Sequence, residues 1–281
     1  MEKKINPMEP TPDELAEFAK KLNADGEVTV EKRQAWDLVD TYGHLQDLID
    51  KDAPFGEGTI KLFQAMITNN NPKIESRYKG KYSYSRKKIV GGGNWECKPF
   101  AEPDTIDARM QRLAKQYESY MKFKPEDPEL TYKVIEHAAE MMVDLIDIHP
   151  FSDGNGRTSR LMADGILISD GLYPMPHWLN PETEDSHIRR QQFGIMMEYA
   201  CRGDFRLILR FMTQQQRLAI EQEFDAIEAN TQATIEATTS GYRNERTLAY
   251  DNLTEYQLAI SKSLLEKPPM ILPLKKTAEE S

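Results

Sequence analysis

The sequence is poor in cysteine and contains no long hydrophobic segment. Only two of its 281 residues are cysteines, Cys97 and Cys201, and they lie far apart without metal-site spacing, so neither a disulfide framework nor a structural zinc site is indicated. No apolar run approaches the roughly 18 residues of a membrane span. The first residues, MEKKINPMEPTPDEL, lack the hydrophobic region of a secretory signal. These absences predict a cytoplasmic protein without a membrane partner.

The chain also lacks an excess of positive charge. It has 36 Lys and Arg residues against 46 Asp and Glu residues, a formal net charge of -10. Nucleic-acid binding requires clustered Lys and Arg, so a nucleic-acid partner is not expected. If the protein handles phosphate, it should do so at one local site.

Most of the sequence has apolar residues at helical spacing, and the predicted fold class is therefore mainly α. Helical patterns cover residues 11–22, 30–49, 58–67, 104–123, 130–148, 157–173, 187–235 and 247–265. We divide the chain into an N-terminal helical region (1–57), a core domain (58–215) and a C-terminal helical appendage with a tail (216–281).

The residue pattern between positions 69 and 103 differs from the helical pattern of the rest of the chain. The segment KYSYSRKKIVGGGNWECKPF alternates aromatic and polar residues and then has a β-branched pair and three glycines. This pattern favours a short β-hairpin. A surface loop is the alternative interpretation.

Residues 149–160, HPFSDGNGRTSR, lie between two predicted helices and concentrate chemically useful residue types. Gly154 and Gly156 leave backbone N–H groups accessible where a helix begins, and such a helix end attracts anions. Arg157 and Arg160 are three residues apart, so both could bind one polyphosphate. The motif therefore predicts a phosphate site, although each residue alone also fits a turn or a solvated surface.

Three further residues of this motif have expected roles. His149 could accept a proton from an attacking hydroxyl as a neutral imidazole. Asp153 could bind Mg²⁺, which often has only one or two protein carboxylate ligands. Phe151 should turn inward and anchor the loop to the core. A histidine at a helix end that only caps the helix, and an Asp-Gly pair that only forms a turn, are the simpler alternatives.

The motif matches without gaps the pattern His-x-Phe-x-Asp/Glu-Gly-Asn-Gly-Arg-x-x-Arg. In this respect the chain resembles the Fic family, whose members transfer AMP from ATP to a protein hydroxyl. The resemblance extends weakly over residues 30–215 and implies a helical-bundle core with a short β-hairpin flap over the active site. It makes residues 58–215 the Fic core domain, with a protein target and, as in many relatives, a homodimer as expected partners.

The resemblance also implies residue roles. His149 would deprotonate the Ser, Thr or Tyr hydroxyl of the target, and Asp153 would bind Mg²⁺, with Mn²⁺ as the alternative ion. Gly154 and Gly156 would form an anion hole for ATP. The remaining phosphate contacts would come from Asn155 at the α-phosphate, Arg157 at the β- and γ-phosphates, and Arg160 at the γ-phosphate.

Two further parts follow from the resemblance. Ile89, Val90 and Gly91 would form the flap edge that aligns a target segment as an added β-strand. Phe193 and Cys201 would line the nucleotide pocket. Relatives similar to animal Fic enzymes have Asn where this chain has Cys201, so a ribose hydrogen bond would be lost and the preferred nucleotide stays open.

Many Fic proteins carry an inhibitory helix with the pattern Ser/Thr-x-x-x-Glu-Gly/Asn, whose glutamate pairs with the second arginine of the motif. No strict copy occurs here. Asp25, followed by Gly26, has a suitable position but a shorter side chain, and it could simply end a helix. Asp251, followed by Asn252, has the better pattern in a less familiar place. We expect weak inhibition through Asp25 and Arg160.

The predicted function is protein adenylyltransferase, acting on a target and on itself. Alternatives with similar chemistry are transfer of UMP, GMP or phosphocholine, or removal of AMP from a modified protein. A different class is a binding protein that senses nucleotides without transferring a group.

Overall fold

The computed structural model describes residues 30–87, 96–123, 130–175, 184–229 and 242–269. The helices are α2 (Val30–Asp50), α3 (Glu57–Ile67), α4 (Ile106–Lys122), α5 (Thr131–Ile148), α6 (Asn155–Ser169), α7 (Glu184–Cys201), α8 (Arg206–Ala229) and α10 (Tyr242–Glu266), with short 3₁₀ turns η1 (Ser76–Tyr78) and η2 (Pro103–Thr105). These residues contain no strand, and none of these helices is both long and apolar enough to cross a bilayer. The predicted mainly α fold is confirmed.

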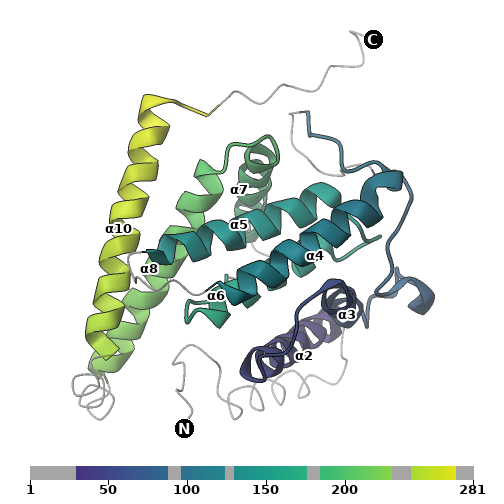
Figure 1. Cartoon of the computed structure of the whole chain (residues 1–281), viewed down its shortest axis with the longest axis horizontal. Helices are drawn as coiled ribbons and strands as arrows, with labels where there is room; N and C mark the ends of the chain where they lie inside the picture. Colours follow the sequence, from purple (N-terminus) through teal and green to yellow (C-terminus); the bar gives the residue numbers. More distant parts are fainter. Residues whose placement is uncertain (1–29, 88–95, 124–129, 176–183, 230–241, 270–281) are drawn as a thin grey trace.

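Helix α5 is the central element of the bundle (Figure 1) and packs against α4, α6, α7, α8 and α10. It can contact so many neighbours because its apolar residues cover much of its circumference. The fully or almost fully buried ones are Val134, Ile135, Ala138, Ala139, Met141, Met142, Leu145 and Ile148. This burial fixes the end of α5, and the residues that follow it are those of the predicted motif.

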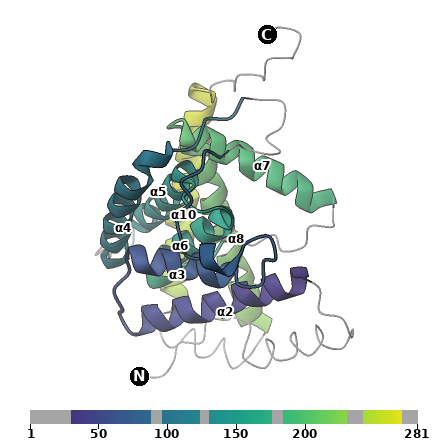
Figure 2. The same cartoon turned by 90° about the vertical axis from the view of Figure 1, so that its right-hand side faces the viewer.

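Helices α2 and α3 form a pair on one side of the bundle, where both also pack against α6 (Figure 2). Leu38 and Leu45 of α2 and Ile60 and Phe63 of α3 are buried in the common core. The pair thereby brings the C-terminal end of α3 next to the start of α6.

Helices α7, α8 and α10 cover another side of α5, and α10 runs along the edge of the molecule (Figure 1). Leu253 of α10 is fully buried in the core. Arg217 of α8 donates hydrogen bonds to Gln257 Oε1 (2.5 Å) and to the Tyr250 hydroxyl (2.8 Å) of α10. The C-terminal helix is therefore packed firmly on the bundle.

Two groups of predicted residues lie outside the described parts of the chain. One is Asp25, the candidate inhibitory residue. The other is the proposed flap edge of Ile89, Val90 and Gly91.

Candidate active site

The motif residues form the loop that joins α5 to α6. His149 ends α5, with its N–H donating to Leu145 O at 2.9 Å, and its φ of 52° and ψ of 54° are left-handed. Gly154 begins α6 with φ of 81°, and a Cβ there would lie 2.8 Å from Thr68 Cγ2. Only glycine fits this position without a shift of its neighbours. The chain thus reverses direction within six residues.

Phe151 and Asn155 hold the loop from inside. Phe151 is fully buried, as its predicted anchoring role requires. Its backbone N–H donates to Asn155 Oδ1 at 2.9 Å, and its carbonyl accepts from Asn155 Nδ2 at 2.8 Å. Both functional groups of the Asn155 side chain are therefore bonded to the loop backbone.

The N-terminus of α6 provides free backbone donors. The N–H of Thr158 donates to Gly154 O at 2.8 Å. The N–H groups of Asn155, Gly156 and Arg157 precede this bond and have no acceptor inside the helix. Gly156 is exposed, and a Cβ added to it would meet nothing within 4 Å. This end of α6 is open to an anion.

Asp153 is exposed, yet three hydrogen bonds fix its orientation. Its Oδ1 accepts from Gly154 N at 2.6 Å, and its Oδ2 accepts from Asn71 Nδ2 at 2.6 Å. Its backbone carbonyl accepts from Gln64 Nε2 at 3.0 Å. Gln64 and Asn71 are both buried, so the loop rests on rigid amide groups from the end of α3 and the turn after it.

The surroundings of Asp153 suit a cation that is shared with phosphate. The described residues contain no group of three or more His, Cys, Asp or Glu side chains that could enclose a metal ion. Mg²⁺ commonly binds one or two carboxylates together with substrate phosphates and water. A single exposed carboxylate beside the start of α6 fits that pattern.

The two motif arginines lie on the first turns of α6 and are half-buried. Arg157 Nη1 donates to Ile67 O at 3.3 Å and to Gln34 Oε1 at 3.4 Å. The guanidinium carbon of Arg160 lies 6.0 Å from the centre of the Phe193 ring of α7. The structure thus brings Arg160 and Phe193, two predicted nucleotide contacts, to the same place.

His149 is covered by an aromatic ring and lies near a lysine. The Phe100 ring stacks on the imidazole with 3.8 Å between the ring centres, and Lys87 Nζ donates to His149 O at 2.6 Å. Burial, followed by the charge of Lys87, lowers the pKa of His149 to about 4. The imidazole is therefore neutral at pH 7, the form that a general base requires.

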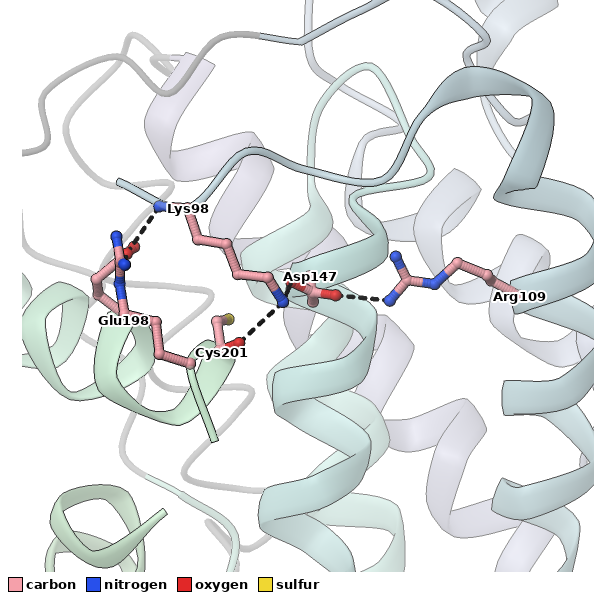
Figure 3. A network of polar contacts seen from close by, with 6 residues as sticks. Lys98, Arg109, Asp147, Glu198 and Cys201 are labelled. Atoms are coloured by element: carbon pink, nitrogen blue, oxygen red, sulfur yellow. Dashed lines mark hydrogen bonds and ion pairs between the residues drawn. The ribbon is translucent and has the colours of Figure 1, made fainter. Parts of the chain in front are cut away.

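A polar network surrounds Asp147, which stands two residues before His149, and Figure 3 shows this network. Lys98 Nζ contacts Asp147 Oδ1 at 2.7 Å and Cys201 O at 2.9 Å, and Arg109 contacts Asp147 Oδ2 at 2.6 Å. The Lys98 N–H donates to Glu198 Oε1 at 2.7 Å. Burial raises the pKa of the Cys201 thiol to about 12, so this thiol is neutral at pH 7. The network joins the ends of α5 and α7.

Comparison with known proteins agrees with this geometry. Residues 54–167 match the model of the Fic/DOC family. This part of the chain is therefore similar to Fic/DOC domains. The match includes α3, α5, the motif loop and most of α6, which are the parts that form the site.

Curated relatives that are similar to this chain are called protein adenylyltransferases. The chain is 37% identical over 108 residues to protein adenylyltransferase Fic of Nematostella vectensis, covering 37% of this chain and 22% of that protein. It is 31% identical over 102 residues to protein adenylyltransferase fic-1 of Caenorhabditis elegans, covering 36% and 18%. The matches thus span about a fifth of the length of these relatives.

A solved structure of Fic-1 (residues 134–508) from C. elegans shares the fold. Its TM-score is 0.58 at 19% sequence identity, and the match covers 76% of this chain and 58% of that one. The likeness therefore reaches beyond residues 54–167 to helices outside the family match.

Asp251 lies away from the Fic motif. It is exposed on α10, which packs against α8 and α5, whereas Arg160 belongs to α6. The structure does not bring these two residues together.

Several residues that organise the Fic site were not found from the sequence. They are Gln64, Asn71, Lys87, Lys98, Phe100 and Asp147. Asp147 stands two residues before His149, which could have drawn attention to it. The others lie 49 to 85 residues before the motif, and nothing in their local pattern shows that they meet it.

Proposed function

We propose that this protein is an adenylyltransferase that transfers AMP from ATP to a Ser, Thr or Tyr hydroxyl of a target protein and of itself. The observation that carries the proposal is the neutral His149 at one end of a loop whose other end opens the N-terminus of α6. A base and an anion site therefore flank one short segment. The names of the relatives support the same reaction.

The proposed reaction is a displacement at the α-phosphorus. His149 takes the proton of the acceptor hydroxyl, and the oxygen forms a bond to the α-phosphorus. The bond from that phosphorus to the bridging oxygen breaks, and pyrophosphate leaves. The N–H groups at the start of α6 would stabilise the charge on the phosphate oxygens. The Asn155 side chain is bonded to the Phe151 backbone. Asn155 would therefore contact the α-phosphate through its own backbone N–H.

The arginines would bind the leaving group. Arg157 would contact the β- and γ-phosphates, and Arg160 the γ-phosphate, because both extend from the first turns of α6. The hydrogen bonds of Arg157 to Gln34 and Ile67 are long, at 3.4 and 3.3 Å, so phosphate oxygens could replace them at little cost. Phe193 and Cys201 would lie toward the nucleoside.

Asp153 is the residue that would hold Mg²⁺, or Mn²⁺ in its place. The ion would neutralise phosphate charge and orient the triphosphate. Asn71 and the Gly154 N–H would keep the Asp153 carboxylate oriented toward it.

Transfer of another group, or removal of AMP, would use the same base and anion site. The test uses four parallel incubations of the protein with Mg²⁺ and a cell lysate, to which ATP, UTP, GTP or CDP-choline is added. Modified peptides are then identified by mass spectrometry. His149→Ala is the control. AMP on hydroxyl side chains, absent from the control, supports the proposal, whereas a different added mass replaces it.

The alternative from another class is a nucleotide-sensing binding protein. This alternative would be favoured if the protein binds ATP but labels no protein. The double variant Asp25→Ala and Asp251→Ala should then also bind ATP without labelling any protein.

We further propose weak inhibition by Asp25 through Arg160 and alignment of the target by Ile89, Val90 and Gly91. We also propose domain boundaries at residues 57 and 215, a homodimer and a cytoplasmic location.

A further inference from the structure

We propose that Phe100 is a positioning residue for His149, and that the polar contacts of Lys98 with Asp147 and Glu198 hold Phe100 in place. The proposal rests on the proposed function, because it assigns His149 the role of base. It adds a link between that base and α7, the helix that carries Phe193 and Cys201.

The contact between the two rings is close and nearly parallel. The ring centres lie 3.8 Å apart, and the ring planes meet at 22°. His149 has a left-handed backbone at the end of α5, with its N–H and carbonyl bound to Leu145 and Lys87. The backbone is therefore fixed, and the remaining freedom of the residue is rotation of its side chain, which also has a hydrogen bond with the Ile146 backbone. A ring stacked on one face restricts that rotation and excludes water from that face.

The segment that carries Phe100 is anchored on both sides of it. Before it, Lys98 donates through its N–H to Glu198 Oε1 (2.7 Å) and through Nζ to Asp147 Oδ1 (2.7 Å). After it, the Ala101 N–H donates to the Asp147 backbone carbonyl at 3.1 Å. Because Asp147 stands two residues before His149, these anchors tie the stacking ring and the base to the same turn of α5.

The charges around His149 make the covering ring important. Lys87 bonds the His149 carbonyl, and Asp153 lies on the other side of the loop, where its charge opposes the effect of Lys87. Asp147, on the preceding turn, is paired with Lys98 and Arg109. Burial is the first cause of the lowered pKa of His149 and the charge of Lys87 is the second, while a hydrogen bond with the Ile146 backbone and the charge of Asp153 act in the opposite direction. Phe100 supplies part of that burial, so its removal should let water reach the imidazole.

The test is an NMR titration of the full chain without nucleotide, using Phe100→Ala, Phe100→Tyr and the unchanged protein. The chain has five histidines, and His149 is assigned from the signal missing in His149→Ala. We expect His149 in Phe100→Ala to titrate at a higher pH, closer to the ordinary value of about 6.5. Phe100→Tyr keeps the stacked ring and should titrate like the unchanged protein.

A kinetic readout separates positioning from nucleotide binding. In Phe100→Ala the kcat should fall about tenfold with little change in the KM for ATP, as expected when a base loses its orientation. The acid limb of kcat/KM should move to higher pH, because a base with a raised pKa becomes protonated earlier as the pH falls. Lys98→Met should change kcat and the acid limb of kcat/KM in the same directions but by less. Lys122→Met, which removes an exposed ion pair with Glu118, is the control and should change neither.

An unchanged titration of His149 in Phe100→Ala would overturn the proposal. Should Phe100→Ala fail to fold, Phe100→Leu takes its place, and the same comparison with Phe100→Tyr decides. The titration needs neither ATP nor transfer, so absence of any transferase activity would refute the proposed function while the proposal for Phe100 is still tested.

Discussion

The two ends of the motif loop are held by different chemistry. At the Asp153 end, the contacts come from the buried neutral amides of Gln64 and Asn71. At the His149 end, they come from the ring of Phe100 and from Lys87. Both ends belong to the six residues between α5 and α6, yet each of these four side chains contacts only one end among the interactions of the described residues.

The difference follows from what each end has to do. A carboxylate that binds a cation must keep lone pairs free, and neutral N–H donors orient it without a competing positive charge. A base must stay neutral, and an apolar ring achieves this by excluding water, with a nearby lysine adding to the effect. One end of the loop is therefore polar and exposed, and the other is partly covered.

The largest effect is expected for His149→Ala. Transfer should fall by about two to four orders of magnitude, the usual contribution of a general base. ATP binding should persist, since the predicted phosphate contacts belong to α6. Rates of labelled-AMP transfer and ATP affinity by calorimetry check both points. Transfer at the normal rate would remove His149 from the mechanism.

A matched pair of glycines tests the Asp153 side. In Gly154→Ala the new Cβ meets Thr68 and the backbone keeps a left-handed φ, so we expect a loss of about 1–3 kcal/mol of stability. Gly156→Ala meets nothing within 4 Å and should unfold at the same denaturant concentration as the parent. If Gly156→Ala nevertheless weakens ATP binding, a phosphate approaches this backbone closely. Equal stability of both variants would contradict the loop geometry.

Asn71→Ala removes a hydrogen bond from the Asp153 carboxylate and leaves the base untouched. The Mg²⁺ concentration for half-maximal ATP binding should rise about tenfold, the size typical when a ligand loses its orienting partner. Asn69→Ala is the control, because this neighbouring side chain is exposed. Titration of Mg²⁺ against a labelled ATP analogue measures the effect. The pH dependence of transfer should stay unchanged, which would separate this end of the loop from the His149 end.

The smallest effect is expected from the inhibitory candidates. Asp25→Ala should raise self-labelling a few-fold, since a short side chain restrains Arg160 weakly. Asp251→Ala should leave self-labelling unchanged, because α10 packs against α8 and α5 and not beside Arg160. The opposite pattern would transfer the inhibitory role to Asp251.

The sequence predicted the helices and the motif well because both depend on local patterns. The apolar stripe of α5 and the inward turn of Phe151 follow from residue spacing alone. The contacts of Asn71 with Asp153 and of Phe100 with His149 join residues 82 and 49 positions apart. Such contacts depend on how the helices pack, and packing does not appear as a pattern in one sequence. The use of the Asn155 side chain to hold Phe151 was missed for a different reason. The resemblance implied a contact between Asn155 and the α-phosphate, and the side chain was not considered as a support for the loop.

The most direct test of the central claim uses ATP labelled in two ways, with ³²P at either the α- or the γ-phosphate. The protein, Mg²⁺ and a cell lysate are incubated with each, and proteins are separated by electrophoresis. Attack at the α-phosphorus predicts that the bands that require the added protein come from α-labelled ATP only, and that these bands are missing with His149→Ala. Bands from γ-labelled ATP that depend on His149, or α-label that persists in His149→Ala, would contradict the account.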